Sequence, residues 1–134
     1  MAYFVYNEGA ESLLDGSIVW ASDTIKARLI ASSATPNKDD VDLSSGYTPI
    51  GTDYTLANKT RTKDTTNDRI VYDNTVDALY SAVAAGSTVG WCIIYKDNGG
   101  THVPIAALDI ADTATNGGDI TVQFHADGIF YLQQ

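Results

Sequence analysis

Apolar and polar residues alternate along most of this chain in short stretches that turn-forming residues separate. In residues 24–31, Ile25, Ala27 and Leu29 share one side of an extended chain, and the side that carries Lys26 is expected to face water. Alternation of this kind is typical of an antiparallel strand with one face against the core.

The most apolar stretch, residues 89–96, predicts a central strand. Both of its sides are apolar, so we expect both faces to be buried, with Cys92 and Ile94 on one of them. Alternation assigns the other face, which is expected to line the core, to Val89, Trp91, Ile93 and Tyr95.

One short helix is predicted near the start of the chain. Asn7 can act as its N-cap, and Glu8 and Glu11 suit the positive end of a helix. Asp15 and Gly16 are expected to end it.

Residues 32–53 read as one long loop, and loops of this length usually pack against something or carry a function. Val41, Leu43, Tyr47 and Ile50 suggest that part of it folds back onto a surface.

Further strands are predicted between turn signals, with residues 76–85 read as irregular or strand. The whole pattern predicts a single all-β domain over residues 1–134, with about eight or nine short strands and one short N-terminal helix. We expect an antiparallel β-sandwich or a jelly-roll-like barrel. The remaining strands are expected at residues 17–20, 54–63, 69–72, 102–109, 120–124 and 129–132.

The net charge and the lengths of the apolar runs bear on which classes of partner the protein can bind. Seventeen acidic and eight basic residues give a net charge of −9, which disfavours nucleic acid as a partner. No run of residues has the length and apolarity of a membrane span or a signal peptide, so no membrane partner is expected.

No catalytic, cofactor or metal site is predicted. Cys92, the single cysteine, lies in the most apolar strand and is expected to be buried and inert. His102 and His125 lie at unrelated points, and no nucleophile or phosphate-loop motif accompanies them. The stretch of residues 39–42, which contains three aspartates, is interpreted as a solvated loop. A metal site on the two histidines and weak calcium binding in that loop remain alternatives.

Half of the basic residues lie within eleven positions. Lys59, Arg61 and Lys63 alternate along a predicted strand and project from one face, and Arg69 follows on the next strand. Such a stripe can be a charged edge that prevents aggregation, or a docking surface for an acidic protein.

The order and spacing of strand and turn pieces over nearly the full chain are more specific than any single motif. The pieces are residues 4–7, 13–16, 23–30, 35–37, 46–48, 55–60, 93–97 and 120–129. Taken together they resemble a family of small structural proteins of tailed bacteriophages.

This resemblance implies a virion component and not an enzyme. We expect a capsid decoration (cement) protein on the exterior of the phage head, made in the host bacterial cytoplasm. The expected partners are the major capsid protein and further copies of the chain, as a dimer or trimer. A tail or head-fibre component is the nearest alternative, and a carbohydrate-binding module or a small hydrolase would belong to a different class.

A cement protein needs a surface that fits the shell. The N-terminal segment is more apolar than a free terminus requires, so we expect it to pack on a neighbouring copy or on the capsid protein. The predicted interface residues are Tyr3, Phe4, Val5, Tyr6, Lys59, Arg61, Lys63 and Arg69.

Overall fold

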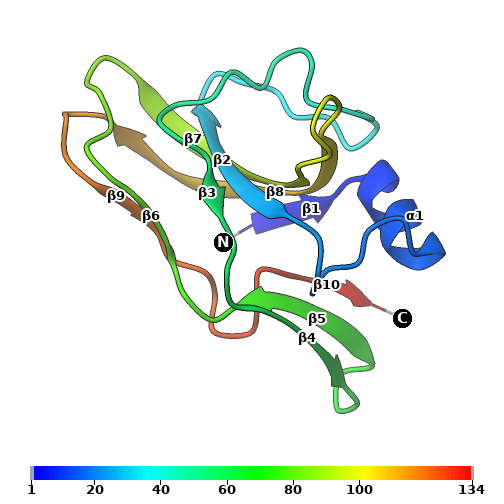
Figure 1. Cartoon of the computed structure of the whole chain (residues 1–134). Coiled ribbons are helices and arrows are strands. Elements are labelled where there is room, and N and C mark those ends of the chain that lie inside the picture. Colours follow the sequence, from blue (N-terminus) through cyan, green and yellow to red (C-terminus); the bar gives the residue numbers. More distant parts are fainter. Residues whose placement is uncertain (1, 134) are drawn as a thin grey trace.

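A computed structural model describes residues 2–133, and it contains ten short strands and one helix (Figure 1). Every strand pair is antiparallel, so the predicted all-β antiparallel fold with a short N-terminal helix is confirmed. The described strands close no barrel. The elements are β1 (Ala2–Val5), α1 (Asn7–Asp15), β2 (Ile25–Ala31), β3 (Tyr54–Thr55), β4 (Lys59–Asp64), β5 (Arg69–Asn74), β6 (Ala78–Tyr80), β7 (Thr88–Lys96), β8 (Val103–Ala114), β9 (Ile120–Val122) and β10 (Phe130–Gln133).

The strands form a five-stranded sheet in the order β1-β8-β7-β2-β3, a three-stranded sheet β10-β5-β4 and a two-stranded sheet β6-β9. The two smaller sheets contribute to the main core on one face of the larger sheet. Trp20 lies in the middle of this core, edge-on to Tyr72 and Phe130. Residues from β2, β7 and β8 form the opposite wall of that core.

The loop of residues 32–53 contributes to a second core on the other face of the five-stranded sheet. Leu43 and Tyr47 are buried there against Ile30 and Ile93. The predicted folding back of this loop is confirmed for these two side chains, but Val41 is 61% exposed. The prediction that β2 has one wet face was therefore wrong, because the loop supplies the cover.

An ion pair attaches the end of this loop to the sheet. Arg28 of β2 donates from Nε and Nη2 to Asp53, and its Nη1 donates to the carbonyl oxygen of Tyr47. Tyr95 of β7 also donates its hydroxyl to Asp53. Both charged side chains are largely buried, so the loop and the strands share one polar network.

A bulge in β7 changes the face on which Val89 lies. Ile30 pairs with Trp91 and Ala31 with Val89, which leaves Gly90 as an extra residue. Val89 therefore joins Cys92 in the main core, and the predicted grouping of Val89 with Trp91 was wrong. A Cβ atom at Gly90 would overlap Ser32, so the bulge requires glycine.

Three local predictions were also wrong. Residues 17–20 form no strand but an irregular segment, although Trp20 is buried. The strand predicted over residues 54–63 breaks after Thr55 and resumes at Lys59. Asn7 is the first helical residue, and its side chain donates to Asp39 instead of capping the helix.

Candidate functional site

The N-terminal segment is an edge strand of the chain's own sheet. β1 pairs with β8, and Tyr3 lies opposite Leu108. Tyr6 is fully buried, with its hydroxyl 2.8 Å from that of Tyr47. Phe4 packs against the ring of Trp91. These residues are therefore not a free apolar terminus, because the fold itself buries Tyr6 and partly covers Tyr3, Phe4 and Val5. Their contact with a neighbouring copy or with the capsid protein stays a prediction.

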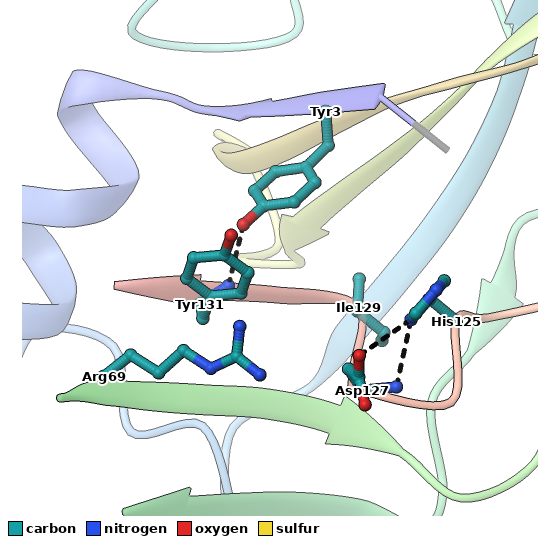
Figure 2. Close-up of a pocket in the computed structure, with 7 residues that line it drawn as sticks. Tyr3, Arg69, His125, Asp127, Ile129 and Tyr131 are labelled. Carbon is teal, nitrogen blue, oxygen red and sulfur yellow. Dashed lines mark hydrogen bonds and ion pairs between the residues drawn. The ribbon is translucent and has the colours of Figure 1, made fainter. Parts of the chain in front are cut away.

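Tyr3 and Arg69, two of the predicted interface residues, meet in a pocket of about 240 Å³ (Figure 2). β1 provides Tyr3 and β5 provides Arg69, while β10 and the turn before it provide the rest of the lining. The pocket thus lies where the edge of the five-stranded sheet meets the three-stranded sheet. Its other lining residues are His125, Asp127, Gly128, Ile129 and Tyr131.

Aromatic and charged side chains fix the inner part of this pocket. The Arg69 guanidinium lies 4.4 Å from the centre of the Tyr131 ring, and its Nε donates to Asp64 at 2.9 Å. The Tyr3 hydroxyl accepts a hydrogen bond from the backbone N–H of Tyr131 at 3.3 Å (Figure 2). Burial raises the pKa of the Tyr3 phenol, so this hydroxyl is protonated at neutral pH.

The rim of the pocket is open to solvent. His125 Nδ1 accepts a hydrogen bond from the backbone N–H of Asp127 and lies 3.7 Å from its carboxylate. The two side chains are 62% and 68% exposed. The lining combines hydroxyl, guanidinium, imidazole and carboxylate groups, so the pocket offers both donors and acceptors of hydrogen bonds to a ligand.

The structure separates Arg69 from the other predicted cations. Arg61 and Lys63 of β4 lie opposite Tyr72 and Ile70 of β5, and the four side chains line one shallow depression. Arg69 lies opposite Asp64, so it projects from the other face of the same sheet. Arg69 follows on the next strand, as predicted, but it does not share a face with Arg61 and Lys63.

The three cations of β4 form the stripe proper and are Lys59, Arg61 and Lys63. They differ in their surroundings. Lys59 is half-buried, its Nζ donates to the carbonyl oxygen of Asp23 at 2.7 Å, and burial lowers its pKa. Arg61 and Lys63 are exposed, and within residues 2–133 neither forms an ion pair. Only these two cations of the stripe are therefore available to a partner.

The chemistry-bearing residues considered from the sequence lie apart. Cys92 is fully buried, as predicted, and burial raises the pKa of its thiol to about 12. His102 packs against Tyr95, whereas His125 lies on the rim of the pocket. Among the described residues, no three His, Cys, Asp or Glu side chains are grouped closely enough to hold a metal ion.

Sequence reasoning missed Tyr131 and Asp127 as neighbours of Arg69. The turn at residues 127–128 was recognisable, but its position beside β5 depends on the pairing of β10 with β5. Tyr131 is more than sixty residues from Arg69 in the sequence, and no local pattern signals that register.

The described part of the chain, residues 2–133, has no helix of the length and apolarity needed to cross a bilayer.

Comparisons with protein-family models, curated proteins and solved structures give no match to this chain.

Proposed function

We propose that this protein is a structural component of a tailed-bacteriophage virion, a cement protein that binds the major capsid protein on the outside of the head. The observation that carries the proposal is the pair of exposed cations Arg61 and Lys63 on a hairpin of a protein with a net charge of −9. Neither cation forms an ion pair with another of the described residues. The resemblance to small phage structural proteins supports the same function.

The hairpin of β4 and β5 extends away from the five-stranded sheet at one end of the molecule (Figure 1). Both cations belong to β4. Two cations against an acidic shell surface add little free energy per copy, but they steer attachment and disfavour wrong partners. Many such contacts, repeated by the symmetry of a head and linked by self-association as a dimer or trimer, give stable decoration through avidity.

The test measures occupancy on heads that lack the protein. Replacement of both Arg61 and Lys63 by Ser should lower occupancy, and the parent's occupancy should fall as salt is raised. Lys38 is the matched control, because it is exposed and has no ion pair among residues 2–133. Lys38→Ser should bind like the parent. A parent that does not bind heads would contradict the cement function.

Electron microscopy of purified virions distinguishes head from tail. Density and stoichiometry of this protein on the capsid lattice support the cement function, whereas density confined to the tail or to head fibres supports the nearest alternative.

A deletion of residues 2–6 would not test the predicted interface role of the N-terminal segment, because it removes β1 and the buried Tyr6 from the fold.

Glycan binding is the second candidate function, and the pocket around Tyr3 and Arg69 favours it. Donors and acceptors beside an aromatic ring are the groups that sugar hydroxyls require. A glycan array would test it with the parent and with Asp127→Asn, which alters a rim acceptor that is mostly exposed. Selective binding that this variant loses would favour a carbohydrate-binding module, and an array without binding would exclude that function for the sugars tested.

A further inference from the structure

β4 is the outer strand of its sheet, and its free edge has a definite pattern of backbone groups. Among the described strands β4 pairs only with β5, and Thr60, Thr62 and the two cations on it are exposed. Just before the strand, the N–H of Thr75 donates to the carbonyl oxygen of Asn58. That bond fixes which residue pairs of the ladder exchange hydrogen bonds, because such pairs alternate along an antiparallel ladder.

Hydrogen-bonded pairs recur at every second residue of the ladder, so the N–H and C=O groups of Thr60 and Thr62 point toward β5, as the C=O of Asn58 does. The corresponding groups of Arg61 and Lys63 then point away from the sheet. The two residues with available charges are therefore also the ones whose backbone groups can pair with a further strand.

A second copy of β4 is a poor occupant of this edge. Any antiparallel pairing that uses the outward backbone groups of both copies places Lys59, Arg61 or Lys63 directly opposite another of these cations. Like charges in directly opposite positions destabilise a strand pair. The edge of β4 therefore disfavours pairing with a second copy of β4 and favours a strand that carries acidic residues opposite its cations.

We propose that the edge of β4 binds an extended acidic segment of another protein as an added strand, with carboxylates opposite Arg61 and Lys63. The carboxylates would lie on the face that holds Ile70 and Tyr72, where the shallow depression gives partial shelter from water. Backbone hydrogen bonds supply the register and the alternate acidic residues supply the selectivity. The inference rests on the proposed docking role of this hairpin and specifies the chemistry of its partner.

The experiment uses the full chain and a blocked heptapeptide in which threonine and glutamate alternate. We expect this peptide to slow hydrogen exchange at the amides of Arg61 and Lys63, measured by nuclear magnetic resonance, and to leave the Lys38 amide unchanged. Binding should weaken as salt is raised. A peptide with lysine in place of glutamate should leave all of these amides unchanged.

A third peptide separates strand addition from simple charge attraction. It keeps the glutamates but carries methyl groups on their backbone nitrogens, so that it cannot donate hydrogen bonds to β4. Strand addition predicts at least a tenfold weaker affinity for this peptide, which corresponds to about 1.4 kcal/mol. Equal affinity for the methylated and unmethylated peptides, or no protection at Arg61 and Lys63, would overturn the proposal.

The variant Arg61→Glu with Lys63→Glu should lose binding to the acidic peptide and gain binding to the lysine peptide. Lys38→Glu is the control for a charge reversal on an exposed residue away from β4, and thermal unfolding confirms that both variants fold. The results are separable from those on heads. A protein that decorates heads but does not bind the peptide contradicts this inference alone, whereas one that binds the peptide but not heads contradicts the cement function alone.

Discussion

Trp20 and Trp91 have different surroundings, so we expect their replacement by alanine to lower the free energy of unfolding by different amounts. Trp20 is 2% exposed and packs edge-on against Tyr72 and Phe130, whereas Trp91 is only partly buried beside Phe4. We expect Trp20→Ala to lower the free energy of unfolding by about 3–5 kcal/mol, the range for a buried aromatic.

Trp91→Ala should cost less, about 1–2 kcal/mol, because part of the ring stays in contact with water in the folded state. Urea unfolding of both variants checks the comparison. Equal losses, or a larger loss for Trp91→Ala, would contradict the assignment of Trp20 to the centre of the main core.

Asp73 predicts an unusual pH dependence. Its Oδ1 is buried and has no hydrogen-bond partner among residues 2–133, and burial raises the pKa of the carboxyl above its usual range. A raised pKa means that the folded protein binds the proton more tightly than the unfolded chain does. The contribution of this group is therefore fully present below the unfolded pKa near 4 and is lost as pH rises through the folded pKa.

Asp73→Asn removes the ionisation, so it should raise the urea midpoint at pH 7 relative to the parent. The gain should shrink as pH falls toward about 4, where the parent's carboxyl becomes protonated. A gain that is the same at both pH values would show that the ionisation of Asp73 is not its source.

The helix α1 packs on β8 at Gly9, and the contact reverses a common rule. Alanine in place of glycine inside a helix usually stabilises by roughly 1 kcal/mol. At Gly9, a Cβ atom would lie 2.6 Å from both Cα of Ile105 and the carbonyl oxygen of Pro104. Gly9→Ala should therefore destabilise, by about 1–3 kcal/mol, since backbone atoms must move apart.

Glu11→Ala is the matched control, because Glu11 is exposed on the same helix. It should change the unfolding temperature little. If Gly9→Ala raised the unfolding temperature, the close approach of α1 to β8 would be excluded.

The loop of residues 32–53 makes the molecule a layered structure with two cores, and Asp53 holds the end of this loop. The side chains of Arg28 and Asp53 are 12% and 15% exposed, so removal of one leaves the other with a largely buried, unpaired charge. Asp53→Asn should lower the free energy of unfolding by about 2–4 kcal/mol. It should also expose residues 32–53 to limited proteolysis before global unfolding.

The control is the more exposed pair of Lys26 and Asp97. Lys26→Met should cost less than about 1 kcal/mol, the usual range for a surface ion pair. Similar losses for the two variants would contradict a structural role for the Asp53 network.

Several features of the fold follow from local sequence. Alternation predicted the antiparallel strand at residues 24–31, observed as Ile25–Ala31, and the central strand at 89–96, and the helix ends at Asp15 and Gly16 as expected. Gly16 has a positive φ of 84°, a conformation that glycine adopts without strain. The burial of Cys92 could also be predicted from the sequence, because its neighbours on both faces of the strand are apolar. These properties depend on residues within a few positions of one another.

Other features depend on contacts between distant segments. The bulge at Gly90 moved Val89 to the other core, and the loop around Tyr47 covered a face of β2 that alternation predicted to be wet. The pairing of β5 with β4 and β10 placed Arg69 beside Tyr131 and away from Arg61. The sequence alone predicts which residues share a face within one strand. Strand register and the packing of layers decide what that face meets, because a shift of one residue turns every side chain to the opposite side.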